Sequence, residues 1–231
     1  MERNMKTAVI FAMQKEAERF IKSYADVMPT MINGIPFYEI TDSLTVCVGG
    51  VGKVNTAISA TILHEHYRPD VIINAGVAGC LEDYPVGSVV VAPHCVQHDV
   101  DTTIAGDPIG LVSTVNVREF YTYNPDNTLK VLTESGIESE FGIVATGDWF
   151  GKDFDRARWV KNEFGALMCD MEAAAVCHVC LRYGTKPVII KVVSDHVFSE
   201  NQDEEYIAGV PLVSKTLTTA TKMLVMHFLN E

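Results

Sequence analysis

Residues 44–75 read LTVCVGGVGKVNTAISATILHEHYRPDVIINA, and this stretch decides the fold class. Leu44–Val48 and Val71–Ala75 are short apolar runs rich in Val and Ile, which is typical of buried strands. Gly49–Gly52 predicts a tight turn, and Lys53–His66 is expected to form a helix. A strand, a helix and a second strand in succession indicate an α/β fold, and we expect the second strand to break at Gly76.

The same alternation continues through the rest of the chain. Further strands are expected at Thr7–Ala12, Val86–Ala92, Gly142–Ala145 and Pro187–Val193, and helices at Lys15–Tyr24, Asp126–Ser135, Phe154–Phe164, Met171–Tyr183 and Val210–Leu229. Asn33-Gly34 predicts a hairpin within residues 31–40, and residues 95–120 read as a strand followed by a long loop. We therefore expect one domain over residues 1–231, a three-layer α/β/α fold with a mixed, mostly parallel central sheet.

Composition limits the classes of partner. The chain has 231 residues, a formal net charge of -12 and 48% hydrophobic residues. The negative charge argues against nucleic acid and anionic membrane surfaces, which both attract Lys and Arg. No secretory leader and no bilayer-spanning run is evident, and the six cysteines are scattered through apolar segments, as in reduced thiols. We expect a cytoplasmic protein without disulfides.

Polar residues gather where the predicted strands end, which is where α/β folds bind ligands. The segments in question are residues 12–16, 49–53, 76–79, 98–101, 146–150, 170–172 and 194–196. Asp195 follows an apolar strand, a costly place for a charge unless the charge is used or paired. Glu16 and Glu172 stand at expected helix starts, where on chemistry alone a favourable interaction with the helix dipole is the better explanation.

Four motifs together carry a resemblance to a known family. They are Ala12-Met13 with Glu16, Gly50-Val51-Gly52-Lys53, Asp170-Met171-Glu172-Ala173 and Ser194-Asp195. In this order and spacing they resemble the nucleoside phosphorylase and nucleosidase superfamily, in particular the 5′-methylthioadenosine/S-adenosylhomocysteine nucleosidase branch. The resemblance extends from Thr7 to Leu229. It implies a nucleoside phosphorylase-like fold and a purine nucleoside as the small-molecule substrate.

The resemblance also implies roles for individual residues. Glu16 matches the carboxylate that activates the attacking water. Glu172 matches the one that binds the ribose hydroxyls, with Met171 packing on the sugar. Asp195 matches the acid that protonates the purine at N7, and Ser194 supports it.

The remaining substrate-binding residues follow from the same resemblance. Phe150 lies where the family stacks an aromatic ring on the base, and the backbone of Phe150 and Gly151 would bind the purine edge. Val51, Val77 and Trp149 are expected beside the nucleoside, although Trp149 could equally be a core residue.

The chemistry is consistent with these roles. Cleavage of an N-glycosidic bond passes through an oxocarbenium-like state, with positive charge on the sugar and negative charge on the base. Carboxylates near the sugar stabilise the first, and an acid at the base neutralises the second. We expect no metal and no other cofactor.

A phosphorylase is the main alternative. Phosphorylases of this superfamily carry a Gly-Asp-Pro-x-Arg-like start and an arginine before the glycine turn after the third strand, whereas this chain has Met13-Gln14-Lys15-Glu16 and Ile73-Asn74-Ala75-Gly76. Arginine is the residue that binds phosphate bidentately. The arginines fall in expected helices or loops: Arg3, Arg19, Arg68, Arg118, Arg156, Arg158 and Arg182. Hydrolysis is therefore favoured over phosphorolysis.

Departures from the family pattern leave the substrate open. Val77 replaces the usual Ser, and Trp149 and Gly151 are unusual. Thr102 and Ala105 replace larger apolar residues that line the 5′-alkylthio pocket from the partner subunit. S-adenosylhomocysteine, 5′-methylthioadenosine, adenosine and 5′-deoxyadenosine all remain candidates.

The base is a separate question. Related futalosine hydrolases, which act on a 6-oxopurine, tend to carry Asn at the Asp195 position, and this favours a 6-aminopurine here. A non-catalytic nucleoside-binding protein is a further alternative.

Other motifs have simpler interpretations. Gly49–Lys53 fails as a phosphate loop because Cys47 occupies the first glycine position and Val54 follows the lysine. Cys177-His178-Val179-Cys180 lacks a second ligand pair and is expected to be buried on a helix.

His98–Asp101 matches a segment that lies near the dimer interface in the family, and it is expected to be structural. A homodimer is implied by the resemblance. The apolar helix around Ile58–Leu63 is either a contribution to it or, equally well, a face of the core.

Overall fold

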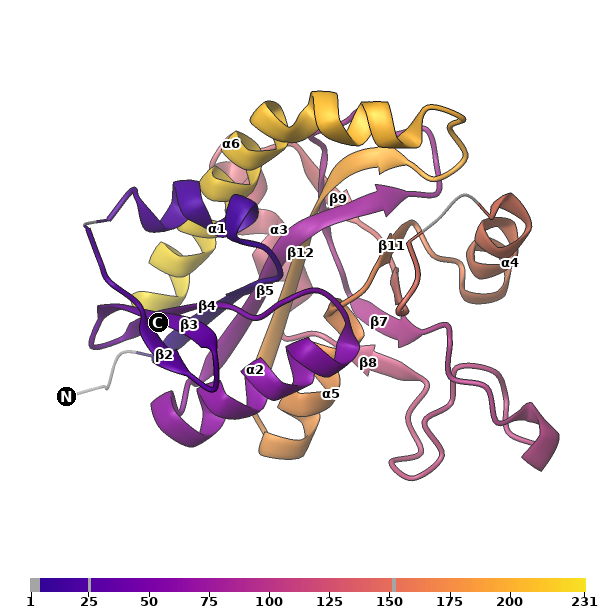
Figure 1. Cartoon of the computed structure of the whole chain (residues 1–231), viewed down its shortest axis with the longest axis horizontal. Helices are drawn as coiled ribbons and strands as arrows, with labels where there is room; N and C mark the ends of the chain where they lie inside the picture. The colour runs from indigo at the N-terminus through magenta and orange to yellow at the C-terminus, as the bar shows by residue number, and fades with distance from the viewer. Residues whose placement is uncertain (1–4, 25, 151–152) are drawn as a thin grey trace.

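A mixed β-sheet forms the middle layer of the structure, a computed structural model that describes residues 5–24, 26–150 and 153–231 (Figure 1). Its main strand order is β2 (Thr30–Ile32), β3 (Ile35–Thr41), β4 (Leu44–Val48), β1 (Thr7–Phe11), β5 (Val71–Cys80), β11 (Met168–Asp170), β10 (Val144–Thr146), β7 (His94–Gln97) and β8 (Glu119–Tyr121). β12 (Lys186–His196) pairs with β5 and with β6 (Val89–Val91), which pairs with β9 (Ser139–Phe141).

Parallel pairing dominates the centre of this sheet. β1 lies parallel between β4 and β5, and β12 runs parallel to β5 along ten registered residue pairs. Antiparallel pairs join β2, β3 and β4 at one edge and β7 to β8 at the other. The predicted mixed α/β sheet is confirmed.

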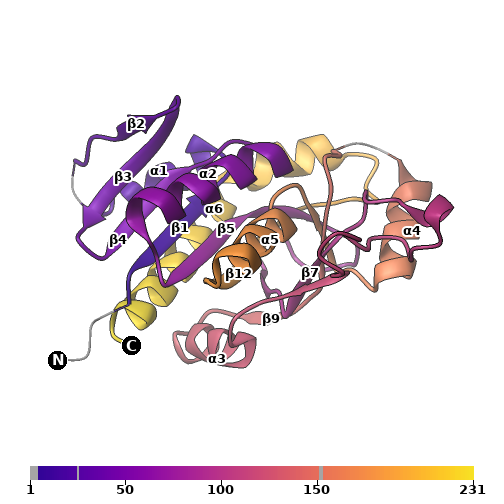
Figure 2. The same cartoon turned by 90° about the horizontal axis from the view of Figure 1, so that it is seen from below.

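Helices cover both faces of the sheet. On one face lie α1 (Gln14–Ile21), α3 (Pro125–Glu134) and α6 (Gln202–Leu229), and on the other lie α2 (Lys53–Tyr67) and α5 (Ala173–Tyr183) (Figures 1 and 2). Phe20 and Leu224 pack on the first face and Leu63 and Cys177 on the second, all within 2% of complete burial. α4 (Phe154–Phe164) packs on a separate apolar cluster. Among the described residues, no helix could span a membrane.

Some element bounds differ from those expected. β5 does not break at Gly76 but runs on to Cys80, because β12 pairs with it throughout, with Gly76 opposite Lys191. α6 begins at Gln202 rather than Val210, since its polar first turns carry no apolar stripe to reveal them. β8, β9 and β11 were not expected as strands, and each is only three residues long, too short to show a period of two.

Candidate active site

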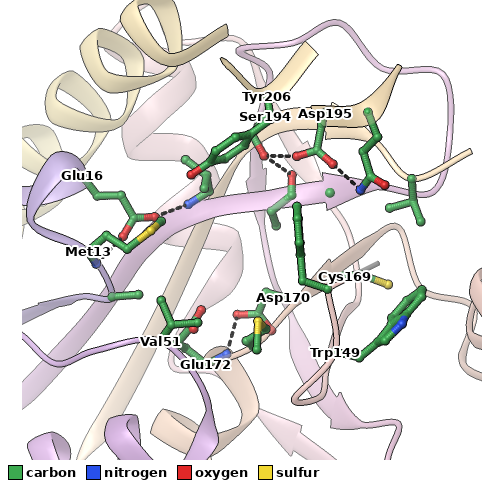
Figure 3. A pocket seen from close by; sticks show the side chains of 18 residues that line it. Met13, Glu16, Val51, Trp149, Cys169, Asp170, Glu172, Ser194, Asp195 and Tyr206 are labelled. Carbon is green, nitrogen blue, oxygen red and sulfur yellow. Dashed lines mark hydrogen bonds between the residues drawn. The ribbon is translucent and has the colours of Figure 1, made fainter. Parts of the chain in front are cut away.

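A cavity of about 410 Å³ opens at the carboxyl end of the parallel strands (Figure 3). It is lined by Ala12, Met13, Glu16, Val51, Val77, Ala78, Gly79, Trp149, Phe150, Cys169, Asp170, Met171, Glu172, Ser194, Asp195, Val197, Gln202 and Tyr206. Figure 3 shows Glu16, Glu172 and Asp195 on different sides of this cavity. Apart from Gly151, which lies outside the described residues, the structure brings together every residue that the sequence predicted for the site.

Glu16 is fixed at the start of α1 by two backbone amides. Its Oε2 accepts a hydrogen bond from Met13 N at 2.8 Å, and its Oε1 accepts one from Val77 N at 3.0 Å. The first contact is the returning half of a capping box, and the second reaches across to β5. Burial raises the pKa of Glu16, while the hydrogen bonds from Val77 and Met13 and the charge of Lys191 oppose the rise. Glu16 therefore both caps α1 and lines the cavity.

Gly76 lets Glu16 approach the sheet. A Cβ atom at this position would lie 3.3 Å from Glu16 Oε1 and 3.3 Å from Lys191 Nζ. These distances are tighter than most real Cβ contacts allow, so a side chain here would push one group away. The glycine that was expected to end a strand instead leaves room for a carboxylate and an ammonium beside the backbone.

Glu172 stands at the N-cap position of α5 and is 6% exposed. Its Oε1 accepts from Gly52 N at 3.0 Å, so the glycine turn after β4 helps to hold it. Its Oε2 lies 3.9 Å from Lys191 Nζ. Burial raises the pKa of Glu172 to about 7; Lys191 and the Gly52 amide oppose this rise, and the negative charges of Asp170 and Glu16 add to it.

Lys191 and Asp170 form a buried ion pair beneath Glu172. Lys191 Nζ lies 2.8 Å from Asp170 Oδ2, and their side chains are 1% and 0% exposed. Asp170 also accepts hydrogen bonds from Ala173 N at 2.8 Å and from the hydroxyl of Thr146. Burial alone would lower the pKa of Lys191, but Asp170 and Glu172 raise it, so the lysine stays charged.

Asp195 lies on the opposite wall, at a bulge in β12. The register between β12 and β5 shifts between Val193 and Asp195, which leaves Ser194 without a partner residue on β5. Successive strand residues normally face opposite sides, but here both Ser194 and Asp195 line the cavity. Asp195 is 1% exposed, and burial raises its pKa against the hydrogen bonds from Ser194 and Gln202.

Aromatic side chains line the cavity and its mouth. Trp149 lines the cavity and packs edge-on against His98, so it is both cavity wall and part of the packing. Phe150 is 67% exposed at the rim, with its ring centroid 6.4 Å from that of Tyr206. Lys15 Nζ lies 4.4 Å from the centroid of the Tyr206 ring.

Four polar side chains in or directly beneath the cavity were not among the residues expected to be functional: Lys191, Asp170, Gln202 and Tyr206. A lysine within the apolar run of residues 188–193 was a usable signal, because a buried charge needs a partner. Gln202 and Tyr206 belong to the polar start of α6, where no pattern indicated a helix.

The motifs interpreted as structural are engaged in packing or turns. Gly50 and Gly52 adopt φ values of 89° and 96° in the turn that leads into α2. Asp99 pairs with Lys53 and accepts from Asp148 N at 3.0 Å. Thr102 and Ala105, which were expected at the 5′-alkylthio pocket from the partner subunit, do not line the cavity of this single chain; Thr102 bonds to Asp107 in the loop around the short helix η1 (Thr103–Ala105).

Sequence comparison decides the family. The model of the phosphorylase superfamily matches residues 6–230. A 5′-methylthioadenosine/S-adenosylhomocysteine nucleosidase from Lysinibacillus sphaericus is 36% identical over 225 residues, covering 93% of this chain and 96% of the relative. The chain belongs to the 5′-methylthioadenosine/S-adenosylhomocysteine nucleosidase family.

Solved structures of nucleosidases and of a futalosine hydrolase share the fold of this chain. The Neisseria meningitidis nucleosidase in complex with methylthio-immucillin-A superposes with a TM-score of 0.87 at 26% identity, covering 96% of this chain and 99% of that one. The futalosine hydrolase of Helicobacter pylori strain 26695 superposes with a TM-score of 0.89 at 25% identity, covering 96% and 98%. The predicted nucleoside phosphorylase-like fold is confirmed.

Proposed function

We propose that this chain hydrolyses the N-glycosidic bond of a 5′-modified adenine nucleoside and releases adenine. The observation that carries the proposal is the placement of three buried carboxyl groups, Glu16, Glu172 and Asp195, around one cavity of about 410 Å³. Their hydrogen-bond and charge partners differ, so each carboxyl group can take a different part in acid–base catalysis.

Asp195 acts on the base. Its burial favours the protonated form, which can give its proton to N7 of the purine as the C1′–N9 bond breaks. The electron pair of that bond then leaves with a neutral adenine. A general acid of this kind typically contributes about 10²–10⁴-fold to the rate.

Glu172 acts on the sugar. As a carboxylate it accepts hydrogen bonds from the ribose hydroxyls and stabilises the positive charge that grows on the ring. Lys191 and the amide of Gly52 favour its charged form, while burial opposes it. Met171, next in sequence and also in the cavity wall, packs against the sugar.

Glu16 acts on the water. Burial raises its pKa and so strengthens it as a base, and the amides of Met13 and Val77 fix its orientation. The water oxygen bonds to C1′ and the water gives its proton to Glu16. The products are adenine and a free 5′-modified sugar.

Water is favoured over phosphate as the nucleophile by the charges of the cavity. The described residues that line it include three carboxylates with raised pKa and no arginine. Arg156 does not line the cavity; its guanidinium carbon lies 4.8 Å from the centroid of the Trp149 ring. Lys191 is 1% exposed and already paired. A phosphate dianion would find no bidentate partner here.

The substrate class follows from relatives that are named as 5′-methylthioadenosine/S-adenosylhomocysteine nucleosidases. The test is adenine release, followed by chromatography, from 5′-methylthioadenosine, S-adenosylhomocysteine, 5′-deoxyadenosine, adenosine and inosine. The highest kcat/KM for one of the first three supports the proposal. Preference for inosine would move the chain towards the 6-oxopurine hydrolases, and cleavage of none would indicate a binding protein.

We also infer a cytoplasmic homodimer. All six cysteines are free thiols, as a reducing compartment allows. On α2, Val54 and Ile58 are 69% and 46% exposed, whereas Leu63 of the same helix belongs to the core. Ile104 is fully exposed on η1, in the magenta loop that reaches away from the sheet in Figure 1. Sedimentation of wild type and Val54→Glu tests the pairing, with a monomeric variant as the expected result.

A further inference from the structure

The first turns of α6 contact the site in three ways. Gln202, Glu205 and Tyr206 have the spacing that places side chains on one face of a helix. Gln202 reaches Asp195, Glu205 reaches His196, and Tyr206 lines the cavity. One helical segment therefore meets the proposed acid, the strand end that carries it, and the cavity wall.

Each carboxyl oxygen of Asp195 has a hydrogen-bond partner, and the chemistry of the partner decides which oxygen can carry the proton. Gln202 Nε2 lies 2.7 Å from Oδ2, and because an amide nitrogen only donates, Oδ2 must accept. The hydroxyl of Ser194 lies against Oδ1 and is also 3.2 Å from the carbonyl oxygen of Ala78. If Asp195 carries its proton on Oδ1, it donates to Ser194, and Ser194 donates to Ala78; when a purine is bound, this Oδ1 proton is the one that passes to N7. The protonated acid thus satisfies every partner only with its proton on Oδ1.

Gln202 is the residue of this segment that contacts the proposed acid directly, and it is 4% exposed. Within the same segment, Glu205 Oε2 accepts from the backbone N of His196 at 3.1 Å and lies 2.9 Å from its Nδ1. The residue after Asp195 is therefore tied to the segment that carries Gln202. Gly79 makes room for the contact, since a Cβ there would lie 3.1 Å from Asp195 Oδ2.

We propose that Gln202 is a positioning residue for the general acid: its amide keeps the acidic proton on Oδ1 of Asp195 and fixes the plane of the carboxyl group. The proposal rests on the proposed function, in which Asp195 protonates the base. Gln202 acts through Asp195, and the amide also favours the ionised carboxylate by donating to it.

Gln202→Leu removes the donor and keeps an apolar side chain of similar size. We expect kcat to fall about tenfold, because the proton can move to Oδ2, with KM changed less than about threefold. The alkaline limb of the kcat–pH profile should move up by about one pH unit, because the carboxylate loses a charge-assisted hydrogen bond. Glu204→Ala, an exposed residue of the same segment, is the matched control and should behave as wild type.

Gln202→Glu is the conservative variant, and an acidic residue suits a helix N-terminus. Its carboxyl group, when protonated, donates to Oδ2 as the amide does, so kcat at acidic pH should return to within about threefold of wild type. Two adjacent carboxyl groups resist double ionisation, so the alkaline limb should move further up than in Gln202→Leu. A loss of kcat equal at every pH in both variants, with no shift of the limb, would overturn the proposal.

Infrared titration of the Asp195 carboxyl group, identified by subtraction of Asp195→Asn, needs no turnover. A higher midpoint in Gln202→Leu than in Glu204→Ala supports the proposal, and equal midpoints contradict it. If the wild type cleaves no nucleoside, the proposed function fails, while this titration still decides whether Gln202 controls the proton on Asp195.

Discussion

Lys191 Nζ lies 2.8 Å from Asp170 Oδ2, and this ion pair is sealed from solvent beneath the cavity. Lys191 comes from the middle of β12 and Asp170 from the end of β11, so the pair joins two strands that flank β5. Asp170 in turn accepts from the first backbone amide of α5, directly after Glu172. The pair therefore supports the sugar-binding carboxylate from below.

Lys191→Met should destabilise the fold by about 3–5 kcal/mol, because it leaves buried negative charge unpaired. Combining it with Asp170→Asn should recover part of that loss, since the charge is removed as well. Denaturant unfolding of the two single variants and the double variant measures the coupling. Strictly additive free energies of unfolding would show that the pair is not coupled.

Glu172 should give the activity an acidic limb near pH 7. Its pKa is raised to about 7, and only the carboxylate accepts from both ribose hydroxyls, so kcat/KM should rise with pH through this value. The residual activity of Glu172→Gln should lack this limb. A limb that persists in that variant would assign the titration to another group.

The same shift predicts a pH effect on stability. The folded pKa of Glu172 is higher than the unfolded value of 4.5, so its contribution is fully present below about pH 4.5 and is lost as the pH rises to about 7. The free energy of unfolding of Glu172→Gln should therefore fall less across this window than that of wild type. Parallel curves for the two proteins would contradict the shift.

Asp195→Asn should reduce kcat by at least about 10²-fold, because an amide cannot give its proton to N7. The protein should remain folded, since the amide oxygen of the new side chain can still accept from Gln202. Circular dichroism checks the fold, and Asp126→Asn, on the exposed start of α3, is the control for the charge change. Full activity in Asp195→Asn would remove the mechanism.

The stability of the protein should also depend on the protonation of His196, which is charged in its protonated form, whereas Glu172 is neutral in its protonated form. Its Nδ1 lies 2.9 Å from Glu205 Oε2 and its Nε2 lies 2.7 Å from the carbonyl of Tyr84, and only the imidazolium donates to both. Burial alone would lower the pKa of His196, but Glu205, the Tyr84 carbonyl and Asp83 raise it above 6.5. The stabilisation is thus present below about pH 6.5 and is lost as the pH rises through the folded pKa.

Thermal unfolding of wild type and His196→Gln tests this contact. The difference in melting temperature should be larger at about pH 6 than at about pH 8.5, because the histidine of the wild type loses its proton as the pH rises through its folded pKa. A difference that stays constant across this range would mean that His196 does not titrate in the folded protein.

The sequence predicted the α/β sheet because long elements such as β12 and α2 show clear apolar runs and helical spacing. It missed β8, β9 and β11, whose three residues carry no period, and it misplaced the start of α6. Glu16, Glu172 and Asp195 were found through motifs, whereas Gln202 reaches Asp195 through a helix start that has no apolar pattern. Lys191 was visible as a charge within a strand, but its partner Asp170 is brought to it only by the order of strands in the sheet.

The central claim is that water, and not phosphate, attacks the sugar. The most direct measurement is cleavage of 5′-methylthioadenosine in ¹⁸O-labelled water, with and without phosphate, followed by mass spectrometry of the sugar product. We predict adenine release at equal rates in both buffers, with ¹⁸O in the free 5′-methylthioribose. Release only with phosphate, giving a sugar phosphate without the label, would contradict the account.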